Sequence, residues 1–174
     1  DPIRCRLELT SQGKILKDII NELRNMIYNL RPMSFDDIGF NITVERALDK
    51  LRNSNNIRCN FKTSGDEYMV DSLVSLTLLR VIQEACSNSI KHGHAREINV
   101  LLKYEPKSLT LTIKDDGDGF DTSAIPEFTR DDNSGFGLSM MKERIYLLSG
   151  KISISSRLGE GCIVKVIIPV NKED

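Results

Sequence analysis

The sequence predicts an α+β domain, a two-layer sandwich of helices and one β-sheet, preceded by a single long helix. Its 174 residues, 40% of them hydrophobic, suffice for one core and an appended element, but hardly for two full domains. After the first helix, stretches with helical spacing and stretches with a period of two follow in the order helix, strand, helix, two strands, loop, helix, two strands. This order favours a sheet whose helices lie on one face.

The long helix is predicted over residues 1–33. Asp1 and Pro2 suit a helix start, because aspartate caps free amide groups and proline fits the first turn. Apolar residues with heptad spacing outline a coiled-coil seam, namely Leu9, Leu16, Ile20, Leu23, Ile27 and Leu30. This narrow seam favours a helical bundle over the alternative, a helix that packs on its own domain. Pro32 disfavours helical geometry in the residue before it, so we place the boundary to the second region, residues 34–174, between about Met33 and Gly39.

The second region carries the remaining helices and strands. The predicted helices cover residues 42 to about 53, 72–92 and 139–148. The predicted strands cover residues 57–62, 97–104, 108–114, 151–156 and 163–169. Asp71 is expected to cap the second of these helices. Gly93 and Gly150 are expected to end the second and the third.

The composition argues against several kinds of partner and site. With 24 basic and 25 acidic residues, the net charge of −1 gives no global attraction to nucleic acid or to an anionic membrane. No apolar run approaches the roughly 20 residues of a membrane helix, and the first residues lack the apolar segment of a signal peptide. The four cysteines form no Cys-x-x-Cys pair, which argues against a zinc site and suits a reducing cytoplasm. We expect a cytoplasmic domain without direct membrane contact, whose parent protein can still be membrane-anchored.

A row of polar residues runs along the helix predicted over residues 72–92. Glu84 and Asn88 are one turn apart and point the same way, and Lys91 and His92 extend the row by another turn. This mixture fits a magnesium-bound triphosphate, which needs an oxygen ligand for Mg²⁺, a group that polarises the phosphoryl acceptor, and positive charge near the phosphates. The alternative is an ordinary polar face in contact with solvent.

Two glycine pairs flank the segment between the strand near residue 114 and the last helix. Gly117 and Gly119 allow a tight turn with room for a base, and Gly135 and Gly137 let backbone amides approach phosphates. Asp116 can accept a hydrogen bond from the exocyclic amino group of adenine, whereas guanine presents a carbonyl oxygen there, which favours ATP over GTP. Each glycine pair alone is weak evidence, because Gly-x-Gly occurs by chance in loops.

Together these motifs resemble those of sensor histidine kinases. Residues 80–92 resemble the N box of that family, residues 116–119 the G1 box, residues 135–144 the G2 region, and residues 159–162 the final Gly-x-Gly-Thr element. They occur in the family order and at compatible spacing. The resemblance implies the Bergerat-type ATP-binding fold that these kinases share with gyrase and Hsp90.

The resemblance extends to one subfamily. The ending Lys91-His92 and the junction Leu30-Arg31-Pro32-Met33 are similar to histidine kinases of the NarL-partner and DegS-like type. There, the helix before the junction is the second helix of the dimerisation and phosphotransfer bundle. The implied reaction is transfer of the γ-phosphoryl group of Mg-ATP to a histidine of that bundle, then to an aspartate of a response regulator.

Position by position, the resemblance implies that Asn88 ligates Mg²⁺, that Glu84 acts as base toward the acceptor histidine, and that Asp116 reads adenine. The segment between the glycine pairs is then a lid over the phosphates. The full set of residues expected to bind nucleotide is Asn88, Lys91, His92, Asp116, Gly117, Gly119, Gly135, Phe136, Gly137, Leu138 and Cys162.

Two departures from the family pattern are visible. Cys162 stands where the family usually has threonine, so a thiol, which is a poorer hydrogen-bonding group, replaces a hydroxyl near the adenine site. The acceptor histidine belongs to a first bundle helix, and neither His92 nor His94 matches its position. This fragment is therefore not expected to phosphorylate itself.

The expected partners follow from the same resemblance. They are a second copy, bound through the bundle of the intact parent, and a response regulator of the LuxR/NarL type. Three rival interpretations remain: a nucleotide-binding regulatory module without turnover, another ATPase or serine kinase of the same fold, and a purely structural dimerisation protein.

Overall fold

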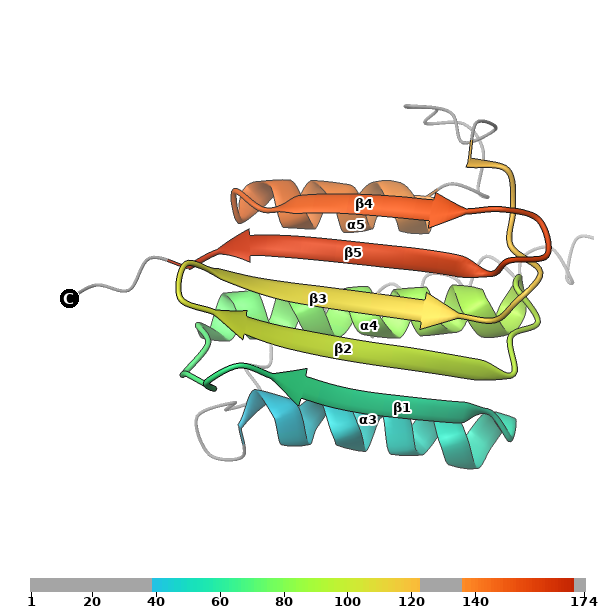
Figure 1. Cartoon of the computed structure of the whole chain (residues 1–174), viewed down its shortest axis with the longest axis horizontal. Coiled ribbons are helices and arrows are strands. Elements are labelled where there is room, and N and C mark those ends of the chain that lie inside the picture. The colour runs from blue at the N-terminus through green and yellow to red at the C-terminus, as the bar shows by residue number, and fades with distance from the viewer. Residues whose placement is uncertain (1–38, 123–135, 171–174) are drawn as a thin grey trace, which may run out of the picture. The chain divides into compact units, whose positions relative to one another are not determined.

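A mixed five-stranded sheet forms one layer of the domain, and three helices cover one of its faces (Figure 1). The computed structural model describes residues 39–122 and 136–170. The helices are α3 (Phe40–Asn55), α4 (Ser72–Lys91) and α5 (Phe136–Leu147), and the strands are β1 (Arg58–Ser64), β2 (Glu97–Glu105), β3 (Ser108–Asp115), β4 (Lys151–Ser156) and β5 (Cys162–Pro169). The predicted α+β sandwich is thus confirmed. The predicted helix over residues 1–33 and most of the predicted lid lie outside the described residues, and the division into two regions stays a prediction.

The strands lie in the order β1-β2-β3-β5-β4. Strands β1 and β2 pair in parallel, and α4 connects them, as a parallel pair requires a crossover. All other neighbours are antiparallel. In the register of β2 and β3, Ile98 lies opposite Asp115. Because directly opposed residues project from the same face of a sheet, Asp115 points toward the helix layer, as buried Ile98 does.

The ends of α4 follow the local sequence signals. The side chain of Asp71 accepts hydrogen bonds from the backbone N–H of Leu73 at 2.8 Å and of Val74 at 3.3 Å, so the predicted cap is confirmed. At the other end, the carbonyl oxygen of Asn88 accepts from the N–H of both His92 and Gly93. The helix therefore stops directly after the polar row that begins at Glu84.

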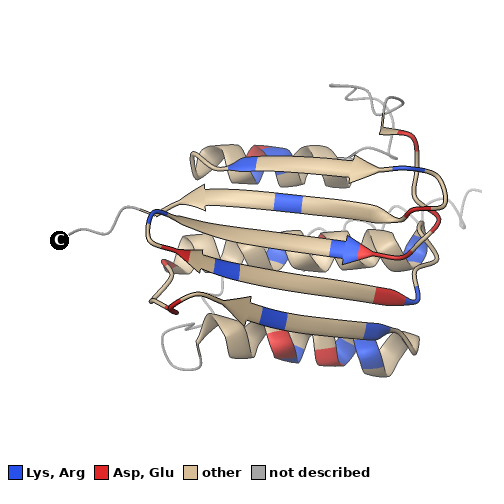
Figure 2. Cartoon of the chain, in the orientation of Figure 1, with Lys and Arg blue, Asp and Glu red and all other residues tan. Residues whose placement is uncertain are grey.

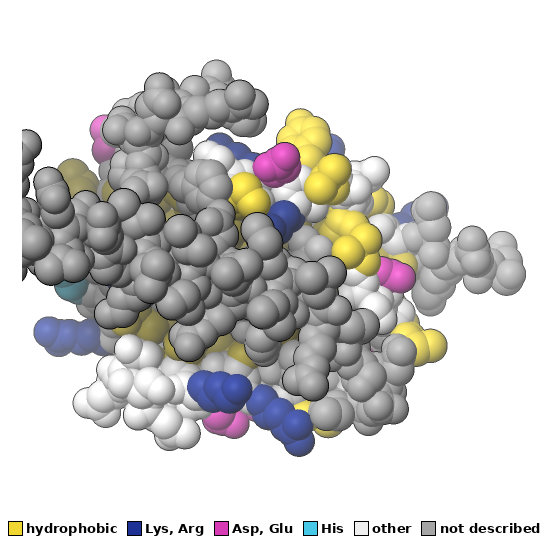
Figure 3. All heavy atoms as spheres, turned by 180° about the vertical axis from the view of Figure 1, so that it is seen from behind, with side chains coloured by type: hydrophobic (Ala, Val, Ile, Leu, Met, Phe, Trp, Pro, Cys, Tyr) yellow, Lys and Arg dark blue, Asp and Glu magenta, His cyan; other side chains and the backbone are white. Residues whose placement is uncertain are grey.

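The hydrophobic core lies between the two layers. Its largest fully buried side chains are Val44, Leu48, Leu78, Leu79, Ile82 and Ile145 from the helices, and Ile98, Leu102, Leu109, Leu111, Ile113 and Ile168 from the strands. Ile42 belongs to the apolar spacing that predicts the helix from residue 42, but in α3 it is 52% exposed, because it lies about half a turn away from buried Val44. Figure 3 looks onto the helix layer and shows that some hydrophobic side chains reach its outer surface. Exposed Leu73 and Tyr146 belong to these helices.

Among the described residues, no helix is long and apolar enough to cross a bilayer.

Candidate active site

Glu84 and Asn88 form a hydrogen-bonded pair on the face of α4. The side-chain N–H of Asn88 (Nδ2) donates to Glu84 Oε1 at 3.2 Å, and both side chains are half-buried. Since the amide nitrogen of Asn88 is turned to the carboxylate, its Oδ1 atom remains as an acceptor pointing away from Glu84. The pair therefore presents a fixed carboxylate beside an amide oxygen.

The start of α5 packs directly against this pair. A Cβ atom on Gly137 would lie 2.0 Å from Glu84 Oε1 and 3.0 Å from its Cδ, so only a residue without a side chain fits in this arrangement. Helix α5 therefore begins next to the Glu84 carboxylate, and its first backbone amides lie in the same region. The structure brings together Glu84, Asn88 and Gly137, which the sequence predicted as parts of one site.

Asp115, the last residue of β3, anchors the opposite part of the site. Its side chain is buried, and three segments donate hydrogen bonds to it. The Ser89 hydroxyl lies 2.6 Å from Oδ2, while the backbone N–H groups of Gly117 and Cys162 lie 2.9 and 3.1 Å from Oδ1. The carboxylate of Asp115 thus joins α4, the loop after β3 and the start of β5.

Glycines allow the backbone to close around Asp115. A Cβ atom on Gly161 would lie 2.2 Å from the carbonyl oxygen of Asp115, and one on Gly117 would lie 2.3 Å from that of Gly93. Gly161 also has a φ of +75°, which residues with a side chain rarely adopt. The N–H of Asp118 donates to the carbonyl of Gly93 at 2.7 Å, so the glycine loop is fastened to the end of α4.

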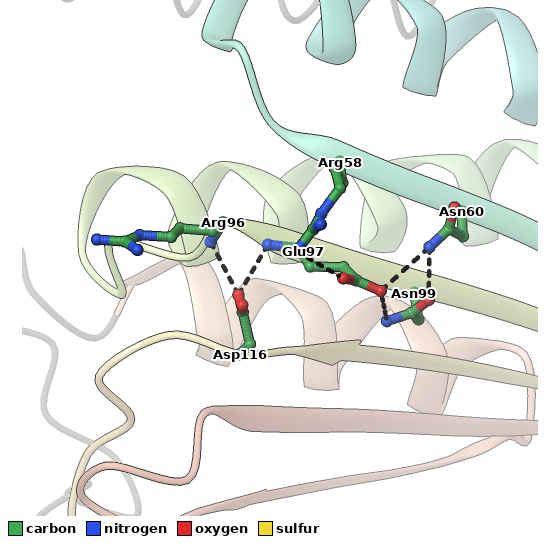
Figure 4. Close-up of polar contacts among 6 residues, drawn as sticks. All are labelled: Arg58, Asn60, Arg96, Glu97, Asn99 and Asp116. Atoms are coloured by element: carbon green, nitrogen blue, oxygen red, sulfur yellow. Dashed lines mark hydrogen bonds and ion pairs between the residues drawn. The ribbon is translucent and has the colours of Figure 1, made fainter.

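Asp116 points away from this cluster. Its Oδ1 atom accepts hydrogen bonds from the backbone N–H of Glu97 at 2.7 Å and of Arg96 at 2.8 Å (Figure 4). These backbone donors, that of Glu97 foremost, hold the pKa of Asp116 below its usual range, although its side chain is exposed. Asp115 is thus the carboxylate that faces α4 and β5, whereas the sequence interpretation assigned adenine recognition to Asp116. Consecutive residues at a strand end point to opposite sides, so a shift of one residue reverses the direction.

Around Asp116, further polar contacts hold the start of β2. The Glu97 carboxylate pairs with Arg58 at 3.2 Å and accepts hydrogen bonds from the side chains of Asn60 and Asn99 (Figure 4). Acidic and basic residues lie side by side where β2 begins and β3 ends, as Figure 2 shows.

The remaining predicted residues occupy different surroundings. Lys91 and His92 are exposed at the end of α4, and half-buried Leu138 packs against the core from α5. The thiol of Cys162 is half-buried, and burial is the main cause that raises its pKa to about 11. Phe136 begins α5, whereas Gly135 lies outside the described residues.

Sequence reasoning missed Asp115 and Ser89. Asp115 follows directly after the strand predicted over residues 108–114, and its inward direction depends on the pairing of β3 with β2, which no local pattern reveals. At 100° per residue, Ser89 falls on the arc of α4 that also carries Ile82, Ala85 and Cys86, and it is buried. A polar residue on a buried arc was the available signal, because a buried hydroxyl requires a partner.

Comparison with known proteins places these residues in a wider context. The family described as "Histidine kinase-, DNA gyrase B-, and HSP90-like ATPase" matches residues 74–172. Two curated relatives match nearly the whole chain. "Signal transduction histidine-protein kinase/phosphatase DegS" of Brevibacillus brevis is 31% identical over 96% of this chain, and an "Uncharacterized sensor-like histidine kinase" of Chloroflexus aurantiacus is 33% identical over 98%. The chain spans only 42% and 29% of their respective lengths.

Solved structures agree in fold. The Acinetobacter baumannii histidine kinase AdeS superposes with a TM-score of 0.64 at 19% identity, over 91% of this chain and 84% of that one. The histidine kinase domain of a blue-light activated kinase from Erythrobacter litoralis gives a TM-score of 0.59 at 18% identity, over 75% of this chain and 60% of that one. At these identities the likeness concerns the fold alone.

Proposed function

The chain belongs to the family of histidine kinase-, DNA gyrase B- and HSP90-like ATPases, and on that premise we propose that it is the ATP-binding catalytic domain of a DegS-like sensor histidine kinase. One observation carries the proposal: α4 contacts the start of α5 through the Glu84–Asn88 pair and contacts Asp115 through Ser89. We call the surroundings of Glu84, Asn88 and Gly137 the phosphate end of the site, and the surroundings of Asp115 its base end. A nucleoside triphosphate needs both.

At the base end, we assign adenine recognition to Asp115. Its Oδ1 atom already accepts two backbone hydrogen bonds, whereas Oδ2 accepts one from Ser89 and keeps a lone pair. The 6-amino group of adenine can donate to that lone pair. Guanine, with a carbonyl oxygen at this position, would meet a carboxylate without a donor. This supports selectivity for ATP over GTP.

At the phosphate end, the backbone amides at the start of α5 suit phosphate oxygens, since a helix amino terminus attracts anions. The Glu84 carboxylate would repel them unless a cation lay between. Asn88 fits that cation, because its Oδ1 atom is a hard oxygen donor beside the carboxylate, and Mg²⁺ is commonly held by one or two protein oxygens together with substrate phosphates and water. Bound there, Mg²⁺ would neutralise phosphate charge. Lys91 and His92 lie beyond Asn88, exposed at the end of α4.

The chemistry assigned to this chain rests on Glu84. As a nitrogen of the acceptor imidazole attacks the γ-phosphorus and the bond from that phosphorus to the ADP oxygen breaks, Glu84 accepts the proton that the imidazole loses. Its hydrogen bond from Asn88 fixes the direction of the carboxylate. The acceptor histidine, a dimer formed through a helical bundle, and a response regulator of the LuxR/NarL type belong to the proposed whole protein.

The base end can be tested with two neighbouring substitutions. Asp115→Asn removes a buried charge that accepts hydrogen bonds, so ATP affinity should fall by about 10- to 100-fold. Asp116→Asn is the matched control: it keeps an oxygen for the N–H groups of Arg96 and Glu97 and should change affinity by no more than about twofold. Isothermal titration calorimetry measures both, with circular dichroism to verify folding. The reverse order of effects would refute the assignment to Asp115.

The phosphate end can be tested at Gly137. In Gly137→Ala the new methyl group must displace the flexible end of the Glu84 side chain, while alanine favours the helix. The free energy of unfolding should therefore stay equal or rise by up to about 1 kcal/mol. Phosphoryl transfer in the full-length protein should fall by about 100-fold, because the base is misplaced. An unchanged rate, measured with γ-labelled ATP, would mean that Glu84 does not act from this position.

A further inference from the structure

We propose that Ser89 is a positioning residue for nucleotide selection: its hydroxyl fixes the Asp115 carboxylate so that the remaining lone pair of Oδ2 faces the 6-amino group of adenine. The inference rests on the proposed role of Asp115. It adds a helix residue that touches no nucleotide itself but decides how well the carboxylate distinguishes adenine from other purines.

The geometry identifies the acceptor of the Ser89 hydroxyl. A hydroxyl has one hydrogen to donate, and two oxygens lie within reach: Asp115 Oδ2 at 2.6 Å and the carbonyl oxygen of Ala85 at 3.0 Å. Hydrogen bonds from a hydroxyl to a carboxylate are about 2.5 to 2.7 Å long and roughly twice as strong as neutral ones. The short distance to Asp115 therefore marks the bond that is made. Ser89 and Asp115 are both only 6% exposed, so water competes little for it.

The other hydrogen bonds to Asp115 do not fix the position of its second carboxylate oxygen, Oδ2. Both backbone donors, Gly117 and Cys162, reach the same oxygen, Oδ1. Two bonds on one oxygen let the carboxylate pivot about that atom and carry Oδ2 out of position. Within the described part of the chain, Ser89 is the one side chain that donates to Asp115. It therefore holds the oxygen that the backbone leaves free.

The neighbouring side chain of Cys162 could not replace the hydrogen bond that Ser89 donates to Asp115. Its thiol is a weak hydrogen-bond donor, and burial, together with the nearby charge of Asp115, raises its pKa to about 11. Cys162 contributes to the carboxylate through its backbone N–H instead. Support for Oδ2 thus comes from the helix layer rather than from β5.

The competing explanation for Ser89 is purely local. Serine in a helix commonly bonds to the carbonyl one turn before, which for Ser89 is that of Ala85. In that case its removal would alter stability without any preference for a nucleotide. The two explanations predict different outcomes when two purine nucleotides are compared.

The test measures the dissociation constants of ATP and of inosine triphosphate, which carries a carbonyl oxygen in place of the 6-amino group. Two variants are compared with the wild type: Ser89→Ala, which removes the hydroxyl, and Ser89→Cys, which keeps nearly the same volume but offers only a weak donor. Both should bind ATP about tenfold more weakly, because a hydrogen bond to a charged group is lost. Affinity for inosine triphosphate should change by no more than about twofold. Ser87→Ala, a half-buried position on the same helix, is the matched control and should change neither value.

Three results would overturn the inference. In the first, Ser89→Cys binds ATP as the wild type does, which would show that volume and not the hydroxyl matters. In the second, both nucleotides lose affinity equally, which indicates a structural role. In the third, the wild type does not distinguish the two nucleotides. That last result contradicts the assignment of adenine recognition to Asp115, and so separates failure of the proposed function from failure of the role of Ser89. Urea unfolding of each variant verifies that the variant is folded before its affinities are compared with those of the wild type.

Discussion

Glu84→Gln is expected to slow phosphoryl transfer by about 100- to 10,000-fold in the full-length protein, the range that a positioned base contributes. Glutamine has the size of glutamate and still offers an oxygen to the side-chain N–H of Asn88, which lies 3.2 Å from the carboxylate. The geometry beside α5 is therefore kept, while the group that accepts the proton is lost. Incorporation of label from γ-labelled ATP, followed over time, measures the rate.

A matched control for Glu84 is available at Glu97. Glu97→Gln makes the same chemical change at the start of β2, where the carboxylate pairs with Arg58 rather than with Asn88. It should leave the transfer rate within about threefold of the wild type, because an ion pair whose arginine is largely exposed contributes little. In Glu84→Gln itself, the affinity for ATP should stay within about twofold of that of the wild type. Equal rates in the two variants would contradict the role of Glu84 as base.

Gly161→Ala is expected to destabilise the domain by about 3 kcal/mol or more, the sum of an unfavourable backbone conformation and of overpacking. A Cβ atom at this position would lie 2.2 Å from the carbonyl oxygen of Asp115, a backbone atom that cannot swing aside. Either β3 or the β4–β5 hairpin must move. Because the N–H of the next residue, Cys162, donates to Asp115, ATP affinity should fall as well.

Gly159→Ala separates the two contributions. Gly159 lies in the same hairpin and has almost the same φ, +78° compared with +75°. Among the residues that the structure describes, a Cβ atom there would meet no atom within 4 Å other than those of its two chain neighbours. Gly159→Ala should lower the free energy of unfolding only by the contribution of the unfavourable backbone conformation, about 1 to 2 kcal/mol. Urea unfolding followed by circular dichroism gives both values. Equal losses would show that the approach of Gly161 to Asp115 has no energetic consequence.

Local patterns were sufficient to predict most of the fold. Alternation with a period of two located all five strands to within two residues, and Asp71 and Gly93 marked the ends of α4 through capping chemistry that depends only on neighbouring residues. Helical spacing also placed Glu84 and Asn88 on one face of the helix, and in the structure their side chains form a hydrogen bond. These signals are all contained within a few residues of chain.

The details that escaped prediction depend on contacts between distant segments. Whether Asp115 or Asp116 turns inward is decided by the pairing of β3 with β2, and a strand end can be predicted only to within a residue or two. The bond from Ser89 to Asp115 spans 26 residues. The approach of Gly137 to Glu84 likewise joins two helices that are separated by two strands and a loop. Periodicity identifies a buried face, but it does not reveal which residue on the opposing layer meets it.

The hydrogen bonds to Asp115 also have a thermodynamic consequence. Their donors lie 26 residues before it, 2 residues after it and 47 residues after it, so the carboxylate is complete only when α4, β3 and β5 have all assembled. An unfolded or half-folded chain has no such site and cannot bind a ligand that depends on it. By linkage, a nucleotide held at Asp115 therefore stabilises the whole domain, by about 2.7 kcal/mol at 100 times its dissociation constant. The melting temperature of the domain is therefore expected to rise with the concentration of the proposed nucleotide ligand.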